Sequence, residues 1–121
     1  MVLADTKMID QEVKRECASS GIDIYSLNNS KANTLAFSSK NRTRREFEVL
    51  FLEDGRYRIS TRFLGYKKVF ELFPRECTCN KDPDGRRKRY SVETKSCTVL
   101  NELLLQMVTN GFETKPRTER L

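Results

Sequence analysis

Apolar residues alternate with charged residues on both sides of the segment Glu53-Asp54-Gly55, and this pattern constrains the fold more than any other feature. The apolar positions are Phe47, Val49 and Phe51 before the segment, and Tyr57, Ile59 and Phe63 after it. A period of two is typical of strands that bury one face. The pattern therefore predicts a β-hairpin over residues 45–64.

The register of this hairpin follows from which side chains must share a face. A three-residue loop with a left-handed Gly55 sets Phe51 opposite Tyr57 and Val49 opposite Ile59. A two-residue Asp54-Gly55 loop would set Phe51 opposite an arginine and mix the faces, so we predict the three-residue loop. On the outer face this register places Leu50 opposite Arg58 and Glu46 opposite Arg62, with Glu48 diagonal to both arginines.

The rest of the chain predicts an α+β fold. The expected elements are a surface helix over 5–20, short strands over 22–25 and 34–37, a strand over 66–73, a strand over 87–94 and a helix beginning at Ser96 or Thr98 and stopping near Gly111. Turns are expected at 28–30 and 82–85. We predict an antiparallel sheet of about four to six strands packed against the amphipathic C-terminal helix. Residues 1–113 would form one domain, with residues 114–121 as a flexible tail.

The charge of the chain points to a polyanionic partner. The net charge is +6, and it divides into −1 for residues 1–39 and +7 for residues 40–121. Basic side chains gather at 40–45, 86–89 and 115–120 and along one face of the hairpin, where they can pair with phosphate oxygens. The predicted nucleic-acid-binding residues are Lys40, Arg42, Arg44, Arg45, Arg56, Arg58, Arg62, Arg86, Arg87, Lys88, Arg89 and Tyr90. Tyr25, Tyr66 and Phe70 are further candidates for stacking on bases.

A second interpretation of the same arginines is structural. Arg56, Arg58 and Arg62 can pair with Glu46, Glu48 and Glu53 on a solvated face, and a net charge of this size also serves solubility. The run Arg86–Arg89 is similar to a nuclear localisation patch or a basic processing site as well.

The second half of the chain resembles a known family. An arginine-rich strand over 56–63, Gly65, a strand over 67–73, the turn Asp82-Pro83-Asp84-Gly85, a strand over 88–93 and a helix from Thr98 follow one another as in the coactivators that bind single-stranded DNA. That family has a curved antiparallel sheet of basic and aromatic strands followed by a helix, and it dimerises. The resemblance implies that the sheet face binds single strands. The strands before Arg56 depart from the family's pattern.

Several classes of protein are disfavoured. The chain has no histidine, which excludes His-dependent catalytic dyads and His-containing zinc sites, and it has no phosphate-binding loop or nucleophile elbow. We therefore expect no enzyme activity, no cofactor and no bound metal. Cys77 and Cys79 have one residue between them rather than the usual zinc spacing, although a small domain held together by four cysteines around zinc stays a third interpretation.

No apolar run reaches the length of a membrane span, and the first residues lack a secretory signal, so we expect a cytoplasmic or nuclear protein.

Two functions remain from different classes. The first is a non-enzymatic module that binds nucleic acid, preferably single-stranded DNA or RNA, through its basic loops and a sheet face. The second is a protein-interaction module, such as a small inhibitor or assembly subunit, that docks an acidic protein surface on its sheet, and a homodimer is possible as well. Salt-sensitive binding to oligonucleotides would distinguish the first function from the second.

Overall fold

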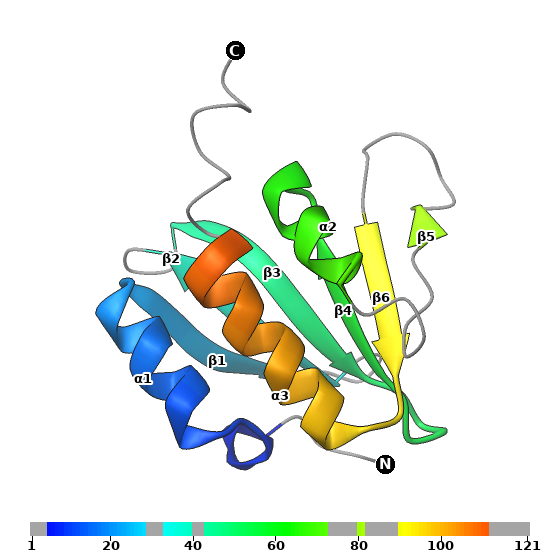
Figure 1. Cartoon of the computed structure of the whole chain (residues 1–121). Helices are drawn as coiled ribbons and strands as arrows, with labels where there is room; N and C mark the ends of the chain where they lie inside the picture. The colour runs from blue at the N-terminus through cyan, green and yellow to red at the C-terminus, as the bar shows by residue number, and fades with distance from the viewer. Residues whose placement is uncertain (1–4, 29–32, 40–42, 73–79, 82–89, 112–121) are drawn as a thin grey trace.

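The computed structural model describes residues 5–28, 33–39, 43–72, 80–81 and 90–111 of the 121-residue chain. These residues form a six-stranded antiparallel sheet in the order β1-β2-β3-β4-β6-β5. The strands are β1 (Ile22–Asn28), β2 (Asn33–Ser39), β3 (Arg44–Phe51), β4 (Tyr57–Thr61), β5 (Asn80–Lys81) and β6 (Tyr90–Thr94). The helices α1, α2 and α3 all lie on one side of this sheet (Figure 1). The predicted α+β fold is thus confirmed.

The hairpin between β3 and β4 has the predicted register. Phe51 lies opposite Tyr57, Val49 opposite Ile59, and Leu50 opposite Arg58. Gly55 has a φ of +90°, a left-handed conformation that residues with a Cβ rarely adopt, so glycine suits the loop. Face parity alone was sufficient to define this part of the sheet.

The N-terminal helix is shorter than predicted. Asp5 accepts a hydrogen bond from the Lys7 amide and caps a 3-10 helix over Thr6–Met8, and the α-helix α1 begins only at Gln11 and ends at Ser19. Ile9 and Asp10 between them are extended. Contacts with α3 explain the break, because the Asn101 side chain donates a hydrogen bond to the Met8 carbonyl and accepts one from the Asp10 amide.

The predicted strand over 66–73 is wrong. Residues Leu64–Phe70 form the helix α2, and Phe73 lies outside the described residues. Tyr66, Val69 and Phe70 are spaced three and four residues apart, which places them on one helical face, and all three are buried. The strand prediction rested instead on Val69, Phe70, Leu72 and Phe73 as a short apolar run buried on both faces, which a helix can also contain. The resemblance to the single-stranded-DNA-binding coactivators loses one of its strands by this correction.

The C-terminal helix closes the core. α3 (Cys97–Gln106) begins where Ser96 Oγ accepts a hydrogen bond from the Val99 amide at 3.1 Å, and a π-helical turn over Met107–Gly111 continues it. Its buried residues join one apolar cluster with α1, α2 and the inward face of the sheet. The members from α3 and the π-helical turn are Leu100, Leu103, Leu104, Met107 and Val108. The predicted helix and its Ser96 start are confirmed.

The outer charge ladder is wrong at Glu46. The register between β2 and β3 shifts there, so that Phe37 pairs with Phe47 but Ser38 pairs with Arg45. Such a bulge turns the extra residue out of the regular alternation. Glu46 is only 1% exposed and accepts a hydrogen bond from Tyr66 at 3.0 Å, so it faces the helices instead of lying opposite Arg62 on the outer face.

Four predictions fall outside the described residues in whole or in part. They are the last two residues of the turn at 28–30, the turn at 82–85, the first residues of the strand over 87–94, and the tail at 114–121.

Candidate functional site

The sheet has one face that no described helix covers, and we call it the open face. It is formed by the residues that alternate with the buried ones along each strand. These are Asp23, Tyr25 and Leu27 on β1, Thr34, Ala36 and Ser38 on β2, Arg45, Glu48 and Leu50 on β3, Arg58 and Ser60 on β4, and Ser91 and Glu93 on β6. The opposite face lies under the three helices (Figure 1).

The centre of the open face is made of small residues that are themselves buried. Ala36 and Ser38 are fully buried, and Thr34 and Ser60 are nearly so. The Tyr25 hydroxyl lies 2.9 Å from Ser38 Oγ, which holds the ring across the neighbouring strand. The face therefore presents mainly its longer side chains to solvent, among them the partly exposed Tyr25 and Leu50.

Three arginines on or beside this face pair with carboxylates. Arg45 Nη1 lies 3.1 Å from Glu48, and Arg58 Nε lies 2.7 Å from Glu93. Arg56, immediately before β4, also bonds Glu93, and its Nε lies 2.7 Å from Asp54 Oδ2. Three positive charges are thus matched by three negative charges.

These ion pairs are only partly exposed. The arginine side chains are 39–41% exposed, whereas Glu48 and Glu93 are 13% exposed beneath them. The hydrogen bond from the Arg56 backbone amide is the largest cause that lowers the pKa of Asp54; burial opposes it, and the Arg56 guanidinium lowers the pKa further. The carboxylates hold the arginines in place through these charge-assisted contacts.

The structure separates the predicted nucleic-acid-binding residues. Arg45, Arg56 and Arg58 gather at the open face, and Arg62 is exposed just beyond β4. Arg44 instead covers the Phe63 ring at 4.4 Å and lies 3.7 Å from Glu46.

The aromatic candidates do not form a stacking platform. Tyr90 pairs with Thr61 and packs against the core on the helix-covered side. Tyr66 and Phe70 are buried there too, which excludes them from stacking on bases. Only Tyr25 lies on the open face. Lys40, Arg42, Arg86, Arg87, Lys88 and Arg89 lie outside the described residues.

No protein-family model, curated protein or solved structure matches this chain. Within the described ranges, no cluster of three or more histidine, cysteine, aspartate or glutamate side chains is arranged to hold a metal ion. None of the described helices has the length and apolar character needed to cross a bilayer.

The two described cysteines have different surroundings. Cys17 is buried among the core residues of α1, and burial, followed by the charge of Glu16, raises the pKa of its thiol to about 12. Cys97 is half-buried at the first turn of α3, with its Sγ 3.7 Å from the Met8 carbonyl oxygen. Cys77 and Cys79 lie outside the described residues.

Sequence reasoning missed the partners that decide the electrostatics of the face. Glu93 joins Arg56 and Arg58 because β6 is the neighbour of β4, and a strand order of this kind leaves no local signal in the sequence. It also missed a cleft at the end of the sheet, which lies between the N-terminal 3-10 helix and the β3–β4 hairpin.

Proposed function

We propose that this protein is a non-enzymatic interaction module that docks an acidic protein partner on its open face. The observation that carries the proposal is the pairing of Arg45, Arg56 and Arg58 with carboxylates on and beside that face. A face with charges of both signs around Leu50 and Tyr25 suits a protein surface, which can supply apolar groups and both charges at matching positions.

The same pairing argues against close contact with phosphates at this face. A polyanion laid across it would meet Glu48 and Glu93 as well as the arginines, and each phosphate contact would have to compete with an existing ion pair. A protein partner avoids this cost because it can place cations near the glutamates. The net charge of +6 acts at longer range and increases the rate at which an acidic partner arrives.

Nucleic-acid binding is the second candidate, and one observation favours it. The excess of positive charge lies entirely in residues 40–121, and the basic residues at 40–42 and 86–89 are additional to the paired arginines of the open face. This binding would use the runs rather than the face, so a variant of the face distinguishes the two functions.

The experiment selects peptides from a random phage-displayed library on the immobilised full-length protein. We expect the selected peptides to combine aspartate or glutamate with apolar residues. Their affinity should fall about tenfold or more in Leu50→Glu, which places a charge at an apolar position of the face. The matched control is Leu72→Glu, the same change at a leucine that is 63% exposed after α2, and it should leave the affinity unchanged.

A second variant protects the test against a folding defect in Leu50→Glu. The double exchange Arg45→Glu with Glu48→Arg keeps the net charge and places opposite charges at the same two positions, but it reverses the pattern of charges, so it should also weaken peptide binding. Equal affinities for the Leu50 and Leu72 variants, or selection of no acidic peptides, would contradict the proposal. Salt-sensitive binding of single-stranded DNA or RNA that is lost in Leu50→Glu would assign the face to nucleic acid instead.

A further inference from the structure

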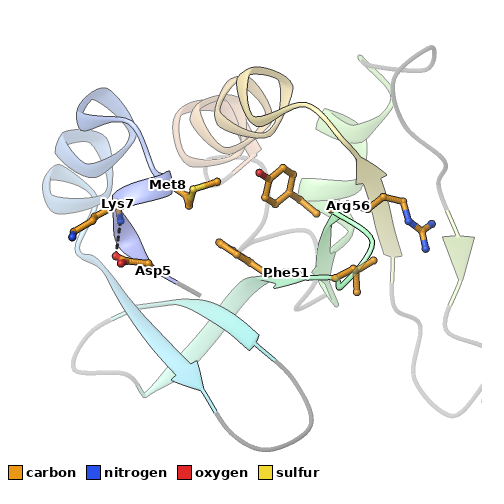
Figure 2. Close-up of a pocket in the computed structure, with 8 residues that line it drawn as sticks. Asp5, Lys7, Met8, Phe51 and Arg56 are labelled. Carbon is orange, nitrogen blue, oxygen red and sulfur yellow. Dashed lines mark hydrogen bonds between the residues drawn. The ribbon is translucent and has the colours of Figure 1, made fainter. Parts of the chain in front are cut away.

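An apolar cleft of about 380 Å³ opens at one end of the sheet. Met8 of the 3-10 helix and Phe51 of β3 face it from opposite walls, while the charged ends of Lys7 and Arg56 point outward at its sides (Figure 2). Leu52 and Tyr57 complete the apolar lining. The volume lies within the range of about 300–1,000 Å³ that is typical of ligand pockets.

Hydrogen bonds to α3 hold one wall of the cleft in place. The Asn101 side chain is 4% exposed, donates to the Met8 carbonyl at 3.1 Å and accepts from the Asp10 amide at 2.8 Å. The segment that carries Met8 is therefore fixed to a core helix rather than free to collapse onto Phe51. A wall that is already ordered lowers the entropic cost of binding a ligand.

The rim of the cleft carries charges of both signs, because Asp5 lines it together with Lys7 and Arg56. Arg56 lies at the side of the cleft and also bonds Glu93 of the open face. Lys7 is exposed on the other side, and among the described residues no carboxylate lies within ion-pair distance of its ammonium group. An apolar group that enters here would bring its neighbouring residues close to Lys7 and to the net positive field of the chain.

We propose that the cleft takes a large apolar side chain, aromatic or branched aliphatic, from an acidic segment of the docking partner. This inference rests on the proposed function and adds its anchor point. The apolar side chain would be buried between Met8 and Phe51, and the carboxylates beside it in the partner would face Lys7. One buried aromatic residue in a pocket is the usual centre of affinity in a protein interface.

The test uses three capped peptides on the purified full-length protein, followed by NMR. They are N-acetyl-Glu-Phe-Glu-amide, the same peptide with alanine at the centre, and the same peptide with lysines in place of both glutamates. The first should shift the Met8 methyl and the Leu52 and Arg56 amide resonances. The alanine peptide should bind at least about tenfold more weakly, because it loses the burial of the phenyl ring.

A variant of the rim tests the charge preference. Lys7→Glu should lower the affinity for the Glu-Phe-Glu peptide and raise the affinity for the Lys-Phe-Lys peptide. Lys68→Glu, which makes the same change of charge at an exposed position of α2, should alter neither preference. Equal affinities of the phenylalanine and alanine peptides, or shifts that lie away from the cleft, would overturn the inference.

The two proposals fail separately. If selected peptides need Leu50 but the phenylalanine peptide leaves the Met8 methyl unchanged, the open face binds a partner and the cleft does not anchor it. If the phenylalanine peptide occupies the cleft but no acidic peptide depends on Leu50, the cleft is a binding site and the proposed function of the open face is wrong.

Discussion

The hydroxyl of Tyr66 on α2 donates a hydrogen bond of 3.0 Å to the carboxylate of Glu46 at the bulge in β3. Both side chains are buried, and Thr61 adds a hydrogen bond to the Glu46 backbone carbonyl at 2.9 Å. A carboxylate in the core is costly unless donors compensate it. The bulge and the helix α2 are therefore linked through this pair, because the bulge turns Glu46 inward and α2 supplies a donor.

Tyr66→Phe should destabilise the fold by about 1–3 kcal/mol, because it removes a donor from a buried carboxylate while keeping the ring. The measurement is urea unfolding at neutral pH, read as a lower midpoint with an unchanged slope. The control is Tyr25→Phe, which removes a hydroxyl from a half-buried ring on the open face and should cost less. An equal loss of stability in both variants would show that the hydrogen bond to Glu46 stabilises the fold no more than the one made by Tyr25.

Asn101→Ala should lower the free energy of unfolding by about 1–3 kcal/mol and should also weaken the binding of the phenylalanine peptide. The variant leaves the Met8 carbonyl and the Asp10 amide without their side-chain partner and frees the wall of the cleft. Urea unfolding gives the stability, and the Met8 methyl resonance reports the wall. Full stability together with unchanged peptide binding would contradict the role given to Asn101.

Gly55→Ala should lower stability by about 1 kcal/mol, because an L residue pays that cost in the left-handed region. A Cβ at this position would meet nothing within 4 Å, so the cost is one of backbone conformation and not of a clash. Gly55→Asn should cost less, since asparagine tolerates this conformation better. Thermal unfolding of the two variants would contradict this if asparagine proved as costly as alanine.

Stability should decline on the alkaline side as pH rises from about 9 towards 12. Burial, and then Glu16, raise the pKa of Cys17 from 9.0 to about 12 in the folded protein, so the unfolded chain loses this proton first. A raised pKa gives stability that is complete below the unfolded value and is lost as pH rises through the folded value.

The alkaline decline should be shallower in Cys17→Ala. The variant loses packing at every pH, so the comparison uses the change in unfolding free energy between pH 8 and pH 10.5 for each protein. Burial, and then Glu46, also raise the pKa of Tyr66, and the wild-type and variant proteins share these two contributions. The charge of Cys17 adds a smaller rise, which the variant removes together with the thiol. An identical decline in the two proteins would show that Cys17 does not contribute to the loss of stability at alkaline pH.

The parts of the fold that were predictable are those in which neighbours along the chain carry the information. The β3–β4 register follows from parity around Gly55, and α3 follows from its leucines at helical spacing. The strand predicted over 66–73 failed because a short apolar run fits both periods, and only its packing under the other helices decides between them.

The candidate site was less predictable because it depends on contacts between distant segments. Glu93 reaches Arg58 through the order of the strands, and Glu46 leaves the outer face because of a bulge against β2. The cleft brings Met8 beside Phe51 through the packing of the 3-10 helix. None of these contacts leaves a local pattern in the sequence.

Photo-crosslinking from the open face shows whether this face contacts an acidic peptide or a nucleic acid. Benzoylphenylalanine replaces Leu50 in one protein and Leu72 in another, and each is irradiated with an equimolar mixture of a selected acidic peptide and a single-stranded oligonucleotide. We expect a peptide adduct from position 50, none from position 72, and no oligonucleotide adduct from position 50. An oligonucleotide adduct at position 50, or peptide adducts of equal yield at both positions, would contradict this expectation.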